Sequence, residues 1–116
     1  MRLTFLPAAL LALAACTPSG DGAAPAKADS HLDCAALISA ADHMMADGRL
    51  ALDTDMQSKV LVSAMTHLNA YAIPQGIAEK DAFAAVDARR DELMASTAPE
   101  EILSRAKACV AKTPRS

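Results

Sequence analysis

Aromatic residues are scarce in this sequence of 116 residues, which has no Trp, one Tyr and two Phe. A chain with so few aromatic side chains has no platform on which nucleic acid bases could stack. It also lacks an excess of positive charge, because 11 Lys and Arg stand against 14 Asp and Glu. Phosphate contacts need clustered Lys and Arg. Both shortages argue against nucleic acid as a partner.

Motifs that indicate an enzyme or a covalent cofactor are missing as well. The sequence has no C-x-x-C pair, hence no C-x-x-C-H site for covalent haem, and no G-x-S-x-G turn that would present a nucleophilic serine. Strand-like alternation and Asn-Gly hairpin turns do not occur either. We therefore expect an all-α protein that is not an enzyme and has neither a cofactor nor a metal.

No apolar run is long enough to span a membrane. The run from Leu3 to Ala15 has 13 residues, whereas a spanning helix needs roughly 20. It follows a positive charge at Arg2 and ends in small residues, which is typical of a secretory signal. Residues 1–15 are therefore predicted to be a signal peptide.

The signal ends in Leu13-Ala14-Ala15-Cys16, which resembles the lipobox of bacterial lipoproteins. The resemblance implies that Cys16 receives a diacylglyceryl thioether, becomes the mature N-terminus and is then N-acylated. Two or three acyl chains would hold the protein firmly at a membrane. Because Thr17 rather than aspartate follows the cysteine, the sorting pattern of the family implies the outer membrane of a Gram-negative host, with the domain on the periplasmic side.

Residues 17–30 contain no large apolar side chain and are rich in Ala, Pro and Gly. Burial of such a segment cannot offset the entropy lost by ordering it. We therefore predict that residues 16–30 are a flexible linker that begins with the lipidated Cys16. The remaining residues, 31–116, suffice for one small helical domain.

Four helices are predicted from apolar residues at helical spacing and from capping residues. The first begins at Ser30 and stops at Gly48, and the second begins at Asp53 or Thr54 and ends at Pro74. The third spans about 78–96, and the fourth begins at Thr97 or Ala98 and stops before Pro114. The residues expected to face the core include Leu37, Ile38, Met44, Met45, Leu61, Met65, Leu68, Ala72, Ala82, Phe83, Val86, Leu93, Met94, Ile102, Leu103, Ala106, Cys109 and Val110.

Short connections between four helices predict a small up-down-up-down bundle. Its core would be thin and marginal without a covalent link. Cys34 in the first turn of the first helix and Cys109 near the end of the fourth would then lie at the same pole. In an oxidising compartment we expect them to form a disulfide, worth roughly 4.5 kcal/mol for a loop of about 76 residues. Two buried free thiols or a redox pair are the alternatives.

His43-Met44-Met45 combines imidazole with thioethers, which suits copper or haem. Consecutive helical residues point about 100° apart, so they cannot converge on one ion. A site would need His67, Met56 or Met65 from the next helix. We interpret the triplet as two core methionines beside a surface histidine.

Ser63, His67 and Tyr71 are spaced i, i+4, i+8 and form a polar row on the second helix. A hydroxyl beside an imidazole suits nucleophilic catalysis, but no acid is placed to orient the imidazole. We expect this row to face solvent or a partner. His43, His67 and Tyr71 are therefore the candidate binding residues.

Two further segments have alternative interpretations. The dense mixed charge of residues 87–92 predicts a solvated face, or a docking face for another envelope protein. Tyr71 and Ile73 in the connection after the second helix either cover the end of the bundle or anchor a protein interface.

A weaker resemblance is carried by Pro74-Gln75-Gly76, Pro99-Glu100-Glu101 and Cys109. These residues resemble the Pro-x-Gly turn, the Pro-Glu-Glu helix start and the last-helix cysteine of immunity proteins that neutralise secreted cell-wall amidases. The arrangement of small helices with one disulfide also resembles that of periplasmic acid-stress chaperones. No functional residue is transferred from either family. The sequence thus favours a non-catalytic envelope lipoprotein that acts as a protein-interaction or structural module, anchored through Cys16. A ligand or metal carrier for haem or copper, or an acid-stress or immunity protein, is the alternative.

Overall fold

Four helices make up the domain in the computed structural model, which describes residues 29–114. They are α1 (His31–Ala46), α2 (Thr54–Ala72), α3 (Glu79–Ser96) and α4 (Pro99–Ala111), with the short 3-10 helix η2 (Ile73–Gln75) after α2. Between residues 29 and 114 there is no strand, so the predicted all-α class is confirmed. The predictions for the signal peptide, for Cys16 and for most of the linker lie outside the described residues. No helix in the described range is long and apolar enough to cross a membrane.

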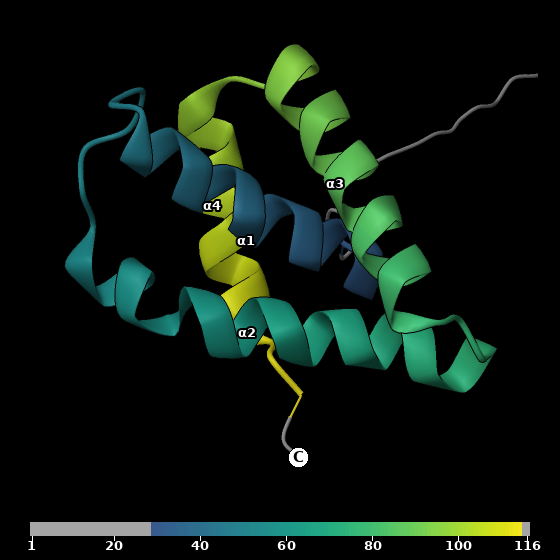
Figure 1. Cartoon of the computed structure of the whole chain (residues 1–116). Coiled ribbons are helices and arrows are strands. Elements are labelled where there is room, and N and C mark those ends of the chain that lie inside the picture. The colour runs from purple at the N-terminus through teal and green to yellow at the C-terminus, as the bar shows by residue number, and fades with distance from the viewer. Residues whose placement is uncertain (1–28, 115–116) are drawn as a thin grey trace, which may run out of the picture.

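Helix α1 lies in the middle of the domain and contacts each of the other three helices. In Figure 1, α2 runs below α1, α3 to its right and α4 behind it. The five consecutive residues Cys34–Ile38 are all buried, and five residues cover every side of a helix. A helix that is apolar on all sides must be enclosed on all sides. Its many alanines let the neighbouring helices approach closely.

The helix ends follow the predicted capping residues. The Ser30 side chain accepts a hydrogen bond from the Asp33 N–H at 3.1 Å, and the Asp53 side chain accepts one from the Met56 N–H at 2.9 Å. Gly48 follows α1 with φ +86°, a conformation that L side chains rarely adopt. Helix α2 ends at Ala72, just before Pro74, as predicted. Pro74 itself lies in the short 3-10 helix η2, whose turn closes at Gly76 with φ +68°. A proline fits there because the first turn of a helix needs no N–H donor.

The disulfide joins Cys34 and Cys109, whose Cα atoms are 5.3 Å apart. Both residues are buried. The pairing confirms that the first turn of α1 and the last turns of α4 meet at one pole of the domain. In a domain with few large core side chains, this bond restricts the unfolded chain as well as the folded one.

The buried face of α2 differs from the predicted one. Leu61 was expected in the core but is 74% exposed, whereas Ser63 and His67 are buried. Residues 63 and 67 lie about 100° or more around the helix from the row that contains Leu61 and Met65. The polar side chains can be buried because the core offers them hydrogen-bond partners, which removes the usual cost of burying them. Phe83, also expected in the core, is 40% exposed.

Replacing both Cys34 and Cys109 with Ala should lower the free energy of unfolding by about 2–5 kcal/mol. The reason is that the unfolded chain loses the loop constraint while the helices keep their packing partners. Urea denaturation followed by circular dichroism measures the difference. The wild-type protein treated with reductant should match the double variant. Two alkylatable thiols at these positions in non-reduced, exported protein would contradict the assignment.

Candidate functional site

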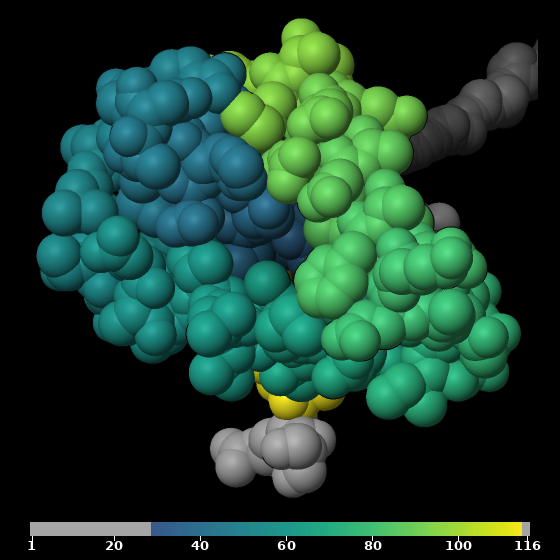
Figure 2. Space-filling view, in the orientation of Figure 1, coloured from purple at the N-terminus to yellow at the C-terminus, as the bar shows by residue number. Residues whose placement is uncertain are grey.

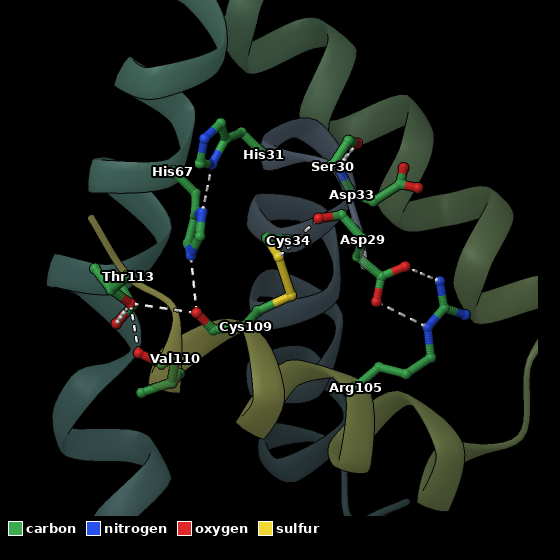
Figure 3. Close-up of a disulfide and its surroundings, with 11 residues drawn as sticks. Asp29, Ser30, His31, Asp33, Cys34, His67, Arg105, Cys109, Val110 and Thr113 are labelled. Carbon is green, nitrogen blue, oxygen red and sulfur yellow. Dashed lines mark hydrogen bonds and ion pairs between the residues drawn. A yellow bond between two sulfur atoms is a disulfide. The ribbon is translucent and has the colours of Figure 1, made fainter. Parts of the chain in front are cut away.

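A polar cluster extends from the core to the surface at the end of the domain that holds the disulfide. It contains His31 at the start of α1, His67 on α2 and Thr113 just after α4 (Figure 3). Ser63 on α2 contacts Thr113 and completes the cluster. Ser63 and His67 are one helical turn apart, so they share the face of α2 that meets the other two segments. The end of α4 is fixed there by the Cys34–Cys109 bond. The cluster thus combines residues from three segments that are distant in sequence.

His67 is the most buried polar residue of the cluster, with 1% of its surface exposed. Its Nε2 lies 2.9 Å from the backbone carbonyl oxygen of Cys109. A carbonyl oxygen only accepts, so Nε2 carries the hydrogen and donates it. In the neutral ring Nδ1 then has a free lone pair. This lone pair accepts a hydrogen bond from Nδ1 of His31, 3.0 Å away. We call His31 and His67 the histidine pair.

Burial lowers the pKa of His67 below its ordinary value of 6.5, because a charged imidazole loses its hydration inside the domain. The Cys109 carbonyl opposes this effect, since it also accepts from a charged ring, but the electrostatic interactions with His31 and Lys112 lower the pKa further. His67 is therefore neutral at pH 7. Nδ1 of the neutral His67 ring thus has a lone pair on the side away from the Cys109 carbonyl.

Ser63 does not contact His67 as a nucleophile would contact its base. Its hydroxyl instead lies 2.9 Å from Oγ1 of Thr113, and that Oγ1 lies 2.7 Å from the carbonyl oxygen of Val110. Thr113 donates its one hydrogen to the carbonyl, and Ser63 donates to Thr113. The hydroxyl groups of Ser63 and Thr113 thus link α2 to the end of α4 by hydrogen bonds. Their role in this arrangement is to satisfy buried polar groups.

Two ion pairs flank the cluster on its other side. Arg105 on α4 contacts Asp29 at 2.7 Å, and Arg89 on α3 contacts Asp33 at 2.7 Å. Neither pair is fully exposed, and the pKa of each arginine is raised by the hydrogen bond that it donates to its carboxylate partner. These contacts tie the start of α1 to the two helices behind and beside it. They fix the position of His31 at the first residue of α1.

The three candidate binding residues predicted from the sequence are not brought together. His43 is exposed and lies 3.4 Å from Arg90, and its position twelve residues after His31 places it about 18 Å further along α1. Tyr71 lies one turn after His67 and is half-buried against the core. The expectation that His67 faces solvent or a partner is wrong, because the Cys109 carbonyl gives it a partner inside the domain.

Met44 and Met45 are buried, as expected. Met45 Sδ lies 3.4 Å from the backbone N–H of Asp53, so it contacts the connection that leads into α2. The three residues of the triplet do not converge on one point. Within the described part of the chain, no three His, Cys, Asp or Glu side chains are grouped as metal ligands.

Sequence reasoning missed His31. The signal that could have identified it is its spacing, since His31 lies three residues before Cys34 and therefore one turn from the predicted disulfide. Its partner was harder to predict, because the choice of His67 depends on which face of α2 turns inward.

The melting temperature should fall as the pH is lowered from 7 to 5. The unfolded chain protonates His67 at its ordinary pKa, whereas the folded domain resists this charge, so the unfolded state binds more protons below about pH 6.5. The contribution of His67 is thus complete above pH 6.5 and is lost as the pH falls toward its lowered pKa.

A His67→Gln variant can still donate to the Cys109 carbonyl but does not titrate, so its melting temperature should depend less on pH in this range. His43→Gln is the matched control and should keep the wild-type slope. Equal slopes in all three proteins would contradict the role given to His67. Calorimetry at several pH values measures these slopes.

Comparisons with known proteins identify no relative. No family model matches the chain, and neither a curated protein nor a solved structure matches it. The function is therefore argued from the sequence motifs and from the geometry of the domain.

Proposed function

We propose that this chain is a non-catalytic lipoprotein of the cell envelope, anchored through Cys16, whose helical domain is a protein-interaction module. The resemblance of residues 13–16 to a lipobox supports the anchor and the periplasmic location. The Cys34–Cys109 disulfide is consistent with an oxidising compartment. An up-down-up-down order of the helices is part of the proposal, because it accounts for the two cysteines at one pole.

The observation that best supports a role in protein interaction is a hollow between α2 and α3. It has a volume of about 150 Å³ and its floor is formed by α1. Figure 2 looks onto this side of the molecule, where α1 is visible in a recess between the teal α2 and the green α3. We call it the α2–α3 hollow; its lining residues are Ala35, Ser39, Ala64, Met65, Leu68, Phe83, Val86 and Asp87.

Exposed apolar side chains lie at the hollow. Phe83 lines it and is 40% exposed, and Leu61, which is 74% exposed, precedes Met65 by one turn on α2. Leu61, Met65 and Leu68 therefore form one row at i, i+4, i+7. Large apolar side chains exposed beside a concave surface are typical of a protein interaction site. The row has the spacing with which one helix packs against another.

The charge of the domain indicates what kind of partner fits. Residues 29–114 contain 13 Asp and Glu and 8 Lys and Arg, a net charge of −5. Asp87 adds a carboxylate to the lining of the hollow. Complementary charge guides two proteins into register. The occupant is therefore an amphipathic helix of another envelope protein, with apolar side chains on one face and Lys or Arg beside them.

Photo-crosslinking in intact cells tests this proposal. A photoreactive amino acid at position 61 or 83 should give the same single crosslinked product, because Phe83 lines the hollow and Leu61 lies one turn of α2 before the lining residue Met65. A Leu61→Ser substitution should reduce the product formed from position 83. Peptide mapping should locate the crosslink in a helix of the partner that carries basic residues.

Position 52 is the matched control. Leu52 is 61% exposed but lies in the connection between α1 and α2, so the photoreactive residue there should not give this product. Crosslinking of equal strength from positions 52 and 61 would show non-specific contact. Crosslinks only to lipid or to a second copy of the chain would also contradict the proposal.

A further inference from the structure

The histidine pair brings two imidazole nitrogens face to face at the end of the domain that holds the disulfide. The two Nδ1 atoms face each other at 3.0 Å, and the ring centroids are 5.2 Å apart with the planes tilted by 39°. Nδ1 of His67 presents a lone pair, since Nε2 of that ring is committed to the Cys109 carbonyl. His31 is exposed at the first residue of α1, so its ring can change position or tautomer at small cost.

His67 shares one feature with histidines that bind metals, the hydrogen bond from its second ring nitrogen to a backbone carbonyl. Such a histidine usually donates its other ring N–H to a carbonyl or carboxylate, which fixes the tautomer and the direction of the ligating nitrogen. The Cys109 carbonyl does this for His67, and the disulfide holds that carbonyl in place. Burial keeps the ring fixed and neutral.

We propose that the histidine pair binds one Cu(I) ion between the Nδ1 atoms of His31 and His67. Metal–nitrogen bonds of about 2 Å place the two ligands of a linear site about 4 Å apart. The observed 3.0 Å must therefore widen by about 1 Å, a shift that the exposed ring of His31 supplies. This site is independent of the α2–α3 hollow and of the proposed interaction role.

The number of ligands selects the metal. Zn²⁺ requires four ligands, of which a protein supplies at least three, and no group of three such side chains exists between residues 29 and 114. Cu(I) is a closed-shell ion that accepts linear coordination by two neutral nitrogen atoms. Imidazole is a good copper ligand. Because both rings are neutral, the loaded site has a net charge of +1, which is that of the ion.

Binding requires a change of tautomer but no net release of a proton. In the metal-free pair, Nδ1 of His31 carries the hydrogen that it donates to His67. When the ion binds, this hydrogen passes to water as a proton, and a proton from water is taken up at Nε2 of the same exposed residue. Both rings remain neutral, and no electron is transferred.

A competition experiment tests the site in the full chain. The protein is kept non-reduced, its free thiols are alkylated, and Cu(I) maintained by ascorbate is titrated against the chromophoric chelator bicinchoninate. Wild-type protein should withdraw one equivalent of Cu(I). His31→Ala should weaken binding by more than the roughly 10–100-fold that loss of an outer-shell partner costs.

His43→Ala is the matched control, because His43 is exposed and remote from the pair, and it should bind as the wild type does. X-ray absorption of the loaded protein should show two nitrogen neighbours and no sulfur. Circular dichroism of His31→Ala checks that the variant is folded. Equal affinity in wild type and His31→Ala, or ligation by methionine sulfur, would overturn the proposal, and the pair would then be a structural hydrogen bond only.

Discussion

The burial of the middle of α1 by three helices is the constraint on which the rest of this structure depends. Helices α2, α3 and α4 each contact α1, and they contact one another much less. A central helix can be covered on every side only if its side chains are small enough for three neighbours to approach, and alanine fills this role in α1. The cost is a core with few large side chains, so the domain relies on the disulfide between the first and the last helix.

The disulfide also determines the chemistry at its pole. It holds the end of α4 against the start of α1, and this places the Cys109 carbonyl 2.9 Å from His67. One backbone carbonyl thereby satisfies a buried imidazole, sets its tautomer and directs its free nitrogen at His31. Burial lowers the pKa of His67, whereas its hydrogen bond to this carbonyl raises the pKa and holds the ring in one orientation.

The orientation of α2 links the two proposals. The helix turns Ser63 and His67 inward, where they have hydrogen-bond partners. This rotation leaves Met65 in the lining of the α2–α3 hollow and Leu61 exposed one turn before it. A helix with both an apolar row and a hydrogen-bonding row can bury only one of them completely against α1. The exposed apolar surface is therefore a consequence of the buried polar cluster.

Local rules in the sequence determined the four helices, because Ser30, Asp53 and Gly48 act on their own turns of the chain, whatever packs against them. The pairing of Cys34 with Cys109 was also predictable, because the number and the order of the helices bring those ends together. The inward face of α2 and the meeting of His31 with His67 were not. Helical spacing shows which residues share a face but not which partner each face will find. Only the tertiary structure supplied the Cys109 carbonyl and Thr113, the acceptors that make burial of His67 and Ser63 favourable.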